Sequence, residues 1–341
     1  GDMTGSISRC TQNTAFMEEW RKGWHPDRAR PKGASETVLI VGAGPTGLEA
    51  ALQAARRGYT VTLAEATTTL GGRVAKERTL PGLSAWGRVS DYRTGQLGPM
   101  PNVEIYRDSP LAPEDLLAMG ADHIAIATGA TWRRDAVARL HLHGVPTDPR
   151  MPLFTPDDLM AGLCPEDQTV TLYDDDHYYM GSVLAELLVQ KGNRVHFVTP
   201  AVKVAEWTDN TLEQGTIMRR LLELGVEIHL SKAPEAIGAK EVTLGCTWTG
   251  RQTTLPTEAV VHVTSRIPND QLFHATKALD WQAQGIRTLT LIGDAAAPGP
   301  IAWATYAGRT WAEGVDQPTQ GDTLTFRREI AALDPGPSLL P

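Results

Sequence analysis

The chain has 341 residues, 41% of them hydrophobic, and a formal net charge of −8 at pH 7. This length allows two domains of ordinary size, each with its own core. The acidic balance and the lack of a basic run argue against a nucleic-acid surface, and no apolar stretch approaches the roughly 20 residues that span a bilayer.

The cysteines and the start of the chain bear on the compartment. Cys10, Cys164 and Cys246 are few, odd in number and far apart, which argues against a disulfide framework and suits a reducing cytoplasm. The first residues show no secretory signal, and Gly1 stands where an initiator Met is expected. We therefore expect a cytoplasmic protein whose sequence is a fragment or a processed chain.

Residues 1–36 are polar and contain several Pro, Gly and Trp, which predicts an extended connector. From residue 37 the sequence "TVLIVGAGPTGLEAALQAARRGYTVTLAEA" predicts a buried strand, a glycine turn, a helix and a second buried strand. This is one βαβ unit. Because the strands are apolar without alternation, we expect a parallel sheet that is covered on both faces.

A glycine pattern joins the first strand to the helix. Gly42, Gly44 and Gly47 form G-x-G-x-x-G, and Glu65 ends the second strand. The first glycine allows a tight turn, the second lets the backbone approach a pyrophosphate, and the third lets the helix pack against the strand. The helix N-terminus favours phosphate, and a carboxylate at the second strand suits an unphosphorylated ribose. We predict an ADP or FAD site; the alternative is a structural turn with a solvated Glu65.

Three later turns belong to the same predicted site. "GGR" (71–73) follows the second strand, "ATG" (127–129) ends a later strand, and "GDA" (293–295) ends the last strand before a helix. In this order they resemble flavoproteins with two dinucleotide domains, where the Asp of the late Gly-Asp bonds the flavin ribityl chain. The alternative for Arg73 is a surface side chain. The predicted cofactor-binding residues are Gly42, Gly44, Pro45, Thr46, Gly47, Glu65, Ala66, Gly72, Arg73, Thr128, Gly129, Gly293 and Asp294.

A second strand, turn, helix and strand occupy residues 168–198 and repeat the first unit. The loop from Asp174 to Gly181 keeps one glycine of three and carries three aspartates, which repel a pyrophosphate by several kcal/mol at close range. Carboxylates also suit the N-terminus of a helix. We predict a domain that keeps its fold, has lost its coenzyme and caps its own helix; the alternative makes Asp174 to His177 metal ligands.

The predicted fold class is therefore α/β, with two dinucleotide-binding domains of the Rossmann-like, glutathione-reductase type on parallel sheets. We expect the second domain to be inserted into the first. The linker would span 1–36, the ADP/FAD-binding domain 38–150 plus 283–341, and the degenerate NAD(P)-binding-like domain 151–282.

The strings "CTQN", "RKGWHP", "DDDHYYMG" and "LIGDAAAP", in this order, resemble the C-terminal half of the trimethylamine dehydrogenase family. The form of the second loop looks most like the dimethylglycine demethylase branch, with histamine dehydrogenase also similar. The resemblance implies an FMN-containing (β/α)8 barrel that oxidises the amine, a [4Fe-4S] cluster on four cysteines, and two domains like these, the first holding ADP.

The sequence departs from that family pattern. The barrel and three cluster cysteines are absent, while Cys10 matches the fourth. Because a cluster needs four ligands, the resemblance implies that the others, with the FMN barrel, lie on a partner subunit or on removed residues. The alternatives for Cys10 are a relic or a free buried thiol. An electron-transfer flavoprotein or an iron–sulfur protein would accept the electrons within an oligomeric complex.

The predicted function is a nucleotide-binding and electron-transfer module of an amine dehydrogenase that oxidises N-methyl groups, for example in dimethylglycine. We expect no catalytic residue in this chain and no amine oxidation by it alone. The alternatives are a self-sufficient FAD-dependent NAD(P)H reductase and a non-catalytic ADP-binding assembly subunit. No GxSxG, HExxH or CxxC pattern supports a hydrolase or a zinc enzyme.

Overall fold

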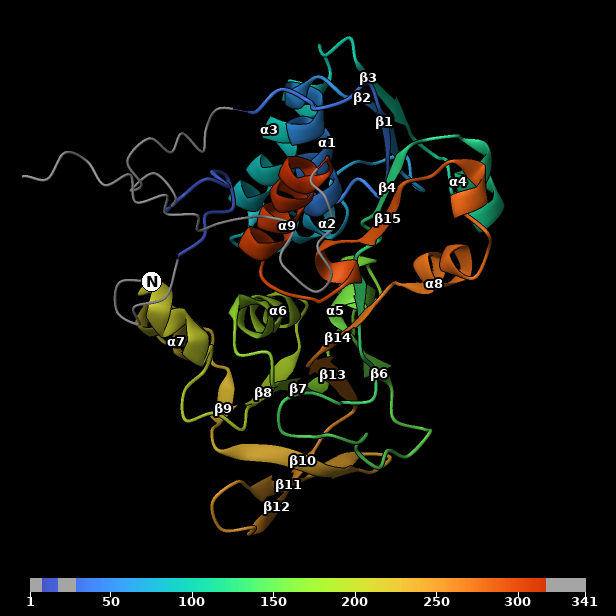
Figure 1. Ribbon diagram of the computed structural model, residues 1–341. Coiled ribbons are helices and arrows are strands. Elements are labelled where there is room, and N and C mark those ends of the chain that lie inside the picture. The colour runs from blue at the N-terminus through green and yellow to red at the C-terminus, as the bar shows by residue number, and fades with distance from the viewer. Residues whose placement is uncertain (1–7, 18–28, 317–341) are drawn as a thin grey trace, which may run out of the picture.

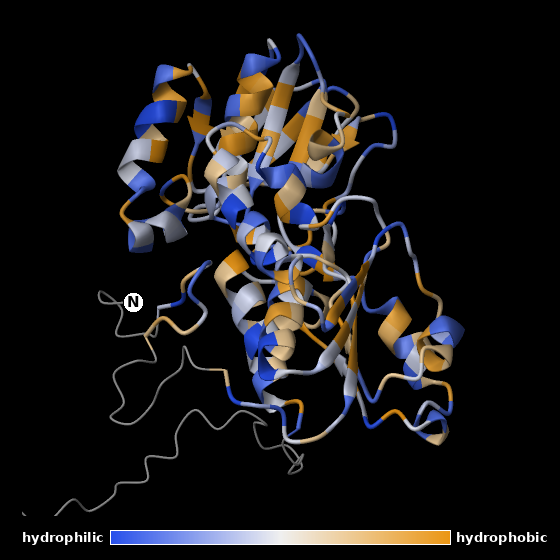
Figure 2. Ribbon diagram, turned by 90° about the horizontal axis from the view of Figure 1, so that it is seen from above, coloured by the Kyte–Doolittle hydropathy of each residue, from blue (hydrophilic) through white to orange (hydrophobic). Residues whose placement is uncertain are grey.

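The computed structural model describes residues 8–17 and 29–316, which form two α/β units (Figure 1). Part of the predicted linker and the last residues of the predicted first domain lie outside the described residues. Strands coloured mainly as hydrophobic lie beside helices that carry hydrophilic turns (Figure 2).

The first unit is built on a five-stranded parallel sheet in the order β15-β4-β1-β2-β3. The strands are β1 (Thr37–Val41), β2 (Thr60–Ala64), β3 (Val103–Tyr106), β4 (His123–Ile126) and β15 (Thr288–Leu291). Alternate residues of β1 enter different cores: Val38 and Ile40 pack with apolar residues of α1, α3 and α9, while Leu39 and Val41 pack with those of α4 and α8. Both faces are therefore buried, which explains the unbroken apolar strands.

Helices cover both faces of this sheet. They are α1 (Pro45–Arg57), α2 (Arg73–Glu77), η1 (Ser84–Gly87), α3 (Arg88–Leu97), α4 (Pro113–Ala118), α8 (Gln271–Lys277), η3 (Gln282–Gln284), η4 (Gly293–Ala295) and α9 (Ile301–Gly314). α9 lies directly against α1, where Gly308 allows the close approach, because an added Cβ there would overlap the carbonyl oxygen of Thr46. The end of the described chain is thus packed on the helix that follows the glycine loop.

The second unit contains another five-stranded parallel sheet, in the order β6-β13-β7-β8-β9. Its strands are β6 (Leu153–Phe154), β7 (Thr169–Asp174), β8 (Arg194–Val198), β9 (Glu227–His229) and β13 (Ala259–Val263). Helices α5 (Pro156–Met160), α6 (Tyr179–Gln190) and α7 (Gln214–Glu223) pack on one face, with η2 (Glu206–Thr211) beside them.

An antiparallel sheet covers the other face of the second unit. It consists of β10 (Lys232–Ile237), β11 (Glu241–Cys246) and β12 (Gln252–Pro256), and its apolar residues pack with Tyr173, Val198 and Val260 of the parallel sheet. The prediction of parallel sheets in both domains did not include this antiparallel sheet. Sheet packs on sheet where a dinucleotide-binding domain would carry helices on both faces.

The chain passes between the units at one place. β5 (Ala130–Trp132) leaves the first unit, β14 (Arg266–Pro268) returns, and the two strands pair in an antiparallel ladder that sets Trp132 opposite Arg266. Among the helices of residues 8–17 and 29–316, none has the length and apolar character to cross a bilayer. The cytoplasmic location stays a prediction.

Candidate functional site

The glycine loop lies between β1 and α1 and is shaped by contacts that only glycine permits. Gly42 has φ +99°, and an added Cβ would lie 2.5 Å from the carbonyl oxygen of Ala127. A Cβ on Gly47 would overlap the carbonyl oxygen of Gly42. The turn and the close approach of helix to strand are therefore structural requirements at these two positions.

Gly44 has a different role, because nothing in the fold forbids a side chain there. It is the N-cap of α1 with φ −72° and ψ −177°, and the nearest atom to an added Cβ is the Cα of Gly72, at 4.0 Å. No side chain caps the helix, and Pro45 follows at its first turn. The positive end of the α1 dipole and its amide N–H groups thus face a bare glycine backbone, which is the arrangement that binds phosphate.

The carboxylate of Glu65 is fixed at the end of β2. Its side chain accepts a hydrogen bond from the backbone N–H of Ala43 at 2.8 Å through Oε2, and from the N–H and hydroxyl of Thr67 at 2.9 Å through Oε1. Glu65 is 8% exposed, so the alternative of a solvated side chain is wrong. Each carboxylate oxygen has two lone pairs, which leaves acceptor capacity for a ribose hydroxyl beside Ala66.

The "ATG" and "GDA" turns predicted around the site lie against the glycine loop. The hydroxyl of Thr128 donates to the carbonyl oxygen of Asn269 at 2.5 Å, and the N–H of Asn269 donates to the carbonyl oxygen of Gly129 at 2.9 Å. Gly293 has φ +64°, and a Cβ there would overlap the hydroxyl of Thr46. The structure therefore brings the "ATG" turn against Gly42, the "GDA" turn against Thr46, and Gly72 against Gly44.

Asp294 is held by two arginines from different parts of the chain. Its carboxylate pairs with Arg266, and its Oδ2 lies 3.5 Å from Nη1 of Arg73. Arg73 also donates to Glu77 at 2.7 Å, and its side chain is 18% exposed, so it is a half-buried member of this network rather than a surface residue. Burial alone would lower the pKa of Arg73, but Glu77 and Asp294 outweigh it and raise that pKa.

Several residues of this ion-pair network were not expected. The pairing of Arg73 with Glu77 has a sequence signal, because the two stand four residues apart on a helix. Arg266 has none, since it lies on a short strand without a motif, and burial lowers its pKa. Tyr179 donates to Glu77 at 3.2 Å and stacks on Trp86 with ring centroids 5.1 Å apart.

The second loop is acidic and buried. Asp174 and Asp175 are 0% and 1% exposed, and burial raises the pKa of Asp174 to about 7. Oδ1 of Asp174 accepts from the N–H groups of Asp176 and His177 at 3.3 Å. An added Cβ on Gly181 would lie 2.8 Å from the Asp174 carboxyl carbon, so this carboxylate takes the space beside the first turn of α6.

The carboxylates do not cap the helix as predicted. Tyr178 is the N-cap of α6, and its side chain makes no cap hydrogen bond. The carboxylate of Asp174 accepts instead from the N–H groups of Asp176 and His177 in the loop. Nor do Asp174 to His177 converge on a metal: within the described parts of the chain, the group of three ligand side chains that does converge is His196, Glu227 and His229.

Asp176 instead lies near the arginines of the ion-pair network around Asp294. Burial raises its pKa, while the positive charges of Arg266, Arg139 and Arg73 act in the opposite direction. The loop that would hold a coenzyme phosphate in a dinucleotide domain thus contributes negative charge to the network around Asp294. Its acidity is compensated by arginines of both units.

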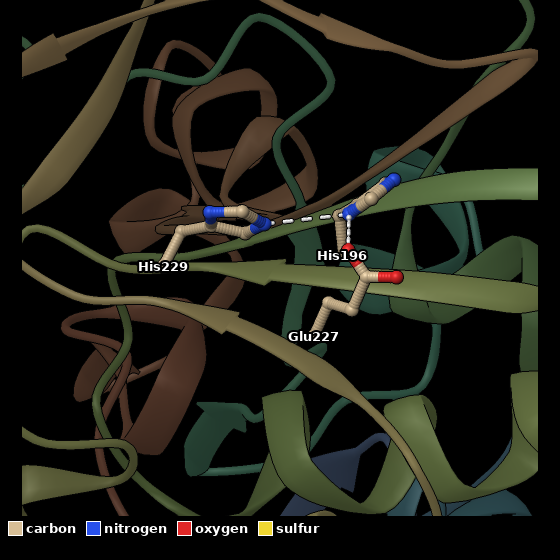
Figure 3. Close-up of side chains that lie close together, drawn as sticks. All are labelled: His196, Glu227 and His229. Atoms are coloured by element: carbon tan, nitrogen blue, oxygen red, sulfur yellow. Dashed lines mark hydrogen bonds and ion pairs between the residues drawn. The ribbon is translucent and has the colours of Figure 1, made fainter. Parts of the chain in front are cut away.

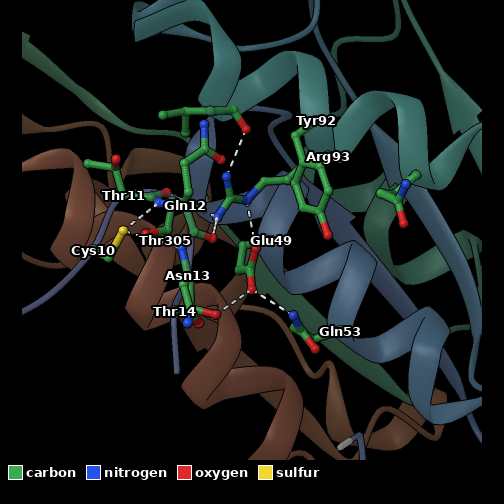
Figure 4. A network of polar contacts seen from close by, with 12 residues as sticks. Cys10, Thr11, Gln12, Asn13, Thr14, Glu49, Gln53, Tyr92, Arg93 and Thr305 are labelled. Carbon is green, nitrogen blue, oxygen red and sulfur yellow. Dashed lines mark hydrogen bonds and ion pairs between the residues drawn. The ribbon is translucent and has the colours of Figure 1, made fainter. Parts of the chain in front are cut away.

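Cys10 lies at the edge of a network of polar contacts around Glu49 of α1 and Arg93 of α3 (Figure 4). Its sulfur accepts hydrogen bonds from the backbone N–H groups of Gln12 and Asn13, each at 3.4 Å. The segment is tied down by Arg93, which donates to Glu49 at 2.6 Å and to the carbonyl oxygen of Thr11 at 3.2 Å. A pocket of about 660 Å³ adjoins it.

The sulfur environment suits an iron–sulfur ligand, but the ligand count does not. Two N–H donors to one sulfur are typical of cluster cysteines. The sequence contains three cysteines, and Cys164 and Cys246 lie near α5 and on β11, in the second unit. These residues do not complete a four-thiolate cluster, and the [4Fe-4S] site stays a prediction.

Comparisons with known proteins place this geometry among flavoproteins. A protein-family model described as FAD dependent oxidoreductase matches residues 37–95, and one described as OYE-like second alpha/beta domain matches residues 154–250. The solved histamine dehydrogenase from Rhizobium sp. 4-9 is 57% identical with a TM-score of 0.93, over 98% of this chain and 52% of that one.

Two curated relatives are also amine dehydrogenases by name. Dimethylamine dehydrogenase from Hyphomicrobium sp. (strain x) is 32% identical over 97% of this chain and 48% of its own. N,N-dimethylglycine/sarcosine dehydrogenase from Chromohalobacter salexigens is 25% identical over 79% of this chain and 38% of its own. The chain therefore spans about half the length of the relatives it matches, is related to amine dehydrogenases, and carries an FAD-dependent oxidoreductase domain.

These matches correct the predicted family assignment. The chain is less similar to the dimethylglycine relative, at 25% identity, than to histamine dehydrogenase at 57% and dimethylamine dehydrogenase at 32%. The restriction to a C-terminal half is withdrawn, because the matches run along 97% and 98% of the chain and an OYE-like domain lies within it.

The same finding corrects the fold and the partner. Residues 37–95 match an FAD-dependent family, whereas residues 154–250 match an OYE-like domain and not a second dinucleotide-binding one. The prediction of two dinucleotide-binding domains is therefore wrong for the second unit. The FMN-containing barrel as a separate partner is likewise withdrawn, because the OYE-like domain belongs to this chain.

Proposed function

We propose that the chain binds ADP at the glycine loop of its first unit and serves a flavin-dependent oxidoreductase that oxidises amines. The observation that carries the nucleotide site is the uncapped N-terminus of α1 facing a bare glycine backbone, beside the buried carboxylate of Glu65. The similarity to histamine and dimethylamine dehydrogenases supports amines as the substrate class.

The glycine loop, Glu65, Ala66 and Gly72 each have a role in this proposal. The backbone from Gly42 to Gly47, with Pro45 and Thr46 at the helix start, holds the pyrophosphate, and Glu65 with Ala66 holds the adenosine ribose. Gly72 lets the "GGR" turn approach Gly44, since an added Cβ on Gly72 would lie 2.9 Å from the Cα of Gly44.

The ion-pair network favours ADP over a complete FAD. In flavoproteins of the resembling type, the Asp of the late Gly-Asp turn bonds the flavin ribityl chain, but Asp294 here is engaged by Arg266 and Arg73 and accepts the N–H of Gly299 at 3.1 Å. The stacked rings of Trp86 and Tyr179 lie beside the same network. Breaking this network to admit a flavin leaves partly buried charges uncompensated, which opposes binding.

The chain's own residues supply binding and orientation in this proposal. A flavin, when bound to the enzyme, supplies the hydride chemistry of amine oxidation. We assign no amine-oxidising residue to the chain, and the second loop binds no pyridine nucleotide because Asp174 occupies the approach to α6. Cys10 as one ligand of a [4Fe-4S] cluster and a soluble electron acceptor stay predictions, and no step depends on them.

Identification of the bound nucleotide tests the proposal. The purified 341-residue chain is denatured, and the released nucleotide is identified by chromatography and mass spectrometry. We expect about one ADP per chain and no flavin. Release of FAD overturns the choice of ADP, and no adenine nucleotide after saturation with ADP overturns the site itself.

The amine part has a separate test. An enzyme isolated from its source with this chain should reduce a dye when histamine or dimethylamine is added. Dye reduction by the purified chain alone would show that it contains a catalytic residue that we have not assigned. No amine-dependent reduction by the isolated enzyme with any primary, secondary or tertiary amine would reject the substrate class.

A further inference from the structure

Three potential metal ligands meet between the two sheets of the second unit (Figure 3). His196 lies on β8, and Glu227 and His229 lie two residues apart on β9, the edge strand that pairs with β8. The pairing sets His196 opposite Glu227, and residues two apart share one face of a strand. The three side chains therefore point to the face that β10–β12 covers, where Val198 also packs.

The distances in this cluster match those of a coordinated metal. Nδ1 of His196 lies 3.3 Å from Nε2 of His229 and 3.3 Å from Oε2 of Glu227, and all three atoms lie within 4.8 Å of one another. Tetrahedral zinc with bonds of about 2.0–2.1 Å places its ligand atoms about 3.3–3.4 Å apart. Two of the three spacings thus already equal the edge of the coordination tetrahedron.

The three side chains also cannot satisfy all of their mutual contacts with hydrogen bonds. A carboxylate oxygen only accepts, and each nitrogen of a neutral imidazole either donates or accepts. Nδ1 of His196 faces both Glu227 and His229, and its single proton cannot point along both contacts. A divalent cation at the common point would satisfy all three lone pairs.

The surroundings hold the ligands in place. Arg194 donates to Oε1 of Glu227 through Nε at 2.8 Å and Nη2 at 2.5 Å, which turns Oε2 toward the histidines. Such a partner behind a ligand carboxylate is usual at metal sites. The ammonium group of Lys232, the other nearby cation, is directed to Thr253 at 2.8 Å.

We infer that His196, Glu227 and His229 form a binding site for a divalent cation of the zinc class. The donor set of two imidazoles and one carboxylate suits Zn²⁺ and its borderline neighbours rather than Mg²⁺ or Ca²⁺. His196 is buried while Glu227 and His229 are partly exposed, so a cation enters from solvent and keeps water at its fourth position. The ion links the edge strand β9 to β8, independently of the nucleotide site.

Zinc titration of the full chain tests this site. The chain is treated with a chelator, dialysed and titrated with Zn²⁺ in a calorimeter. We expect one ion per chain in the unaltered protein and at least about 10-fold weaker binding in His229→Ala and Glu227→Gln. The matched control is His274→Ala, because His274 is exposed and contacts Asp270 outside the cluster.

A thermal melt provides the second readout. Zn²⁺ at about 100 times its Kd should raise the Tm of the unaltered chain by roughly 4 °C and leave that of His229→Ala unchanged. If His229→Ala fails to fold, Glu227→Gln decides, since it keeps the shape of a partly exposed side chain. No saturable binding, or equal affinity in both variants and the unaltered chain, overturns the inference.

Discussion

Replacing Gly44 by alanine should remove the nucleotide while leaving the fold intact. The backbone of Gly44 has ordinary dihedral angles, and an added Cβ meets no atom closer than 4.0 Å. The expected loss of folding stability is about 1 kcal/mol or less, from the poorer N-cap. The methyl group, however, stands where the proposed pyrophosphate must approach the backbone.

The cost to binding follows from the hydrogen bonds that are lost. Two charge-assisted bonds from the first turn of α1, at about 1.5–3 kcal/mol each, give about 3–6 kcal/mol. At about 1.4 kcal/mol per tenfold, ADP affinity should fall by roughly 10² to 10⁴. Calorimetric titration with ADP measures this, after bound nucleotide has been removed.

Gly95→Ala in α3 is the matched control, because an added Cβ there also meets no atom within 4 Å and it lies away from the loop. It should bind ADP as the unaltered chain does. If Gly44→Ala binds ADP with unchanged affinity and remains folded by circular dichroism, the pyrophosphate does not lie against this backbone and the reasoning fails.

Three further predictions concern the second loop and the Cys10 segment. Burial raises the folded pKa of Asp174 from 3.8 to about 7, so ionisation of this carboxyl lowers the folding stability as pH rises from about 4 to 7. Urea unfolding should therefore show Asp174→Asn to be more stable than the unaltered chain by a few kcal/mol at pH 8, but not at pH 4. A difference that does not change with pH would contradict this. Arg93→Ala should lose about 3–5 kcal/mol by leaving Glu49 buried and unpaired, and should speed alkylation of Cys10; an unchanged alkylation rate would show that Arg93 does not hold the segment. With the first site saturated by ADP, NADH and NADPH should bind the chain with no measurable heat, and saturable binding under that condition would show that Asp174 does not block the second loop.

Local signals carried much of the first unit. The apolar run of β1, the spaced glycines and the amphipathic α1 each act within a few residues, so the strand, turn and helix follow from pattern alone. Glu65 at the end of β2 belongs to the same local unit. Gly42 is required because Ala127 lies close to it, and Gly47 is required because Gly42 lies close to it. These are the tight turn and the close helix packing that the glycine pattern predicts.

Long-range packing decided what local patterns did not. The segments "EVTLG" and "EAVVHVTS" are equally strand-like, yet the first joins an antiparallel sheet as β11 while the second enters the parallel sheet as β13. Their pairing depends on which partner is available in three dimensions. For the same reason the pairing of Arg266 with Asp294, which lies 28 residues further along the chain, could not be predicted from the sequence.

The pairing of β5 with β14 has a consequence for how such chains evolve. Because Trp132 and Arg266 stand opposite each other, the segment between β5 and β14 leaves the first unit and returns to it at neighbouring positions. This segment can therefore be lengthened, replaced or changed in the order of its strands without displacing a strand of the first sheet. The sheet of the first unit can thus stay the same while the residues between β5 and β14 change.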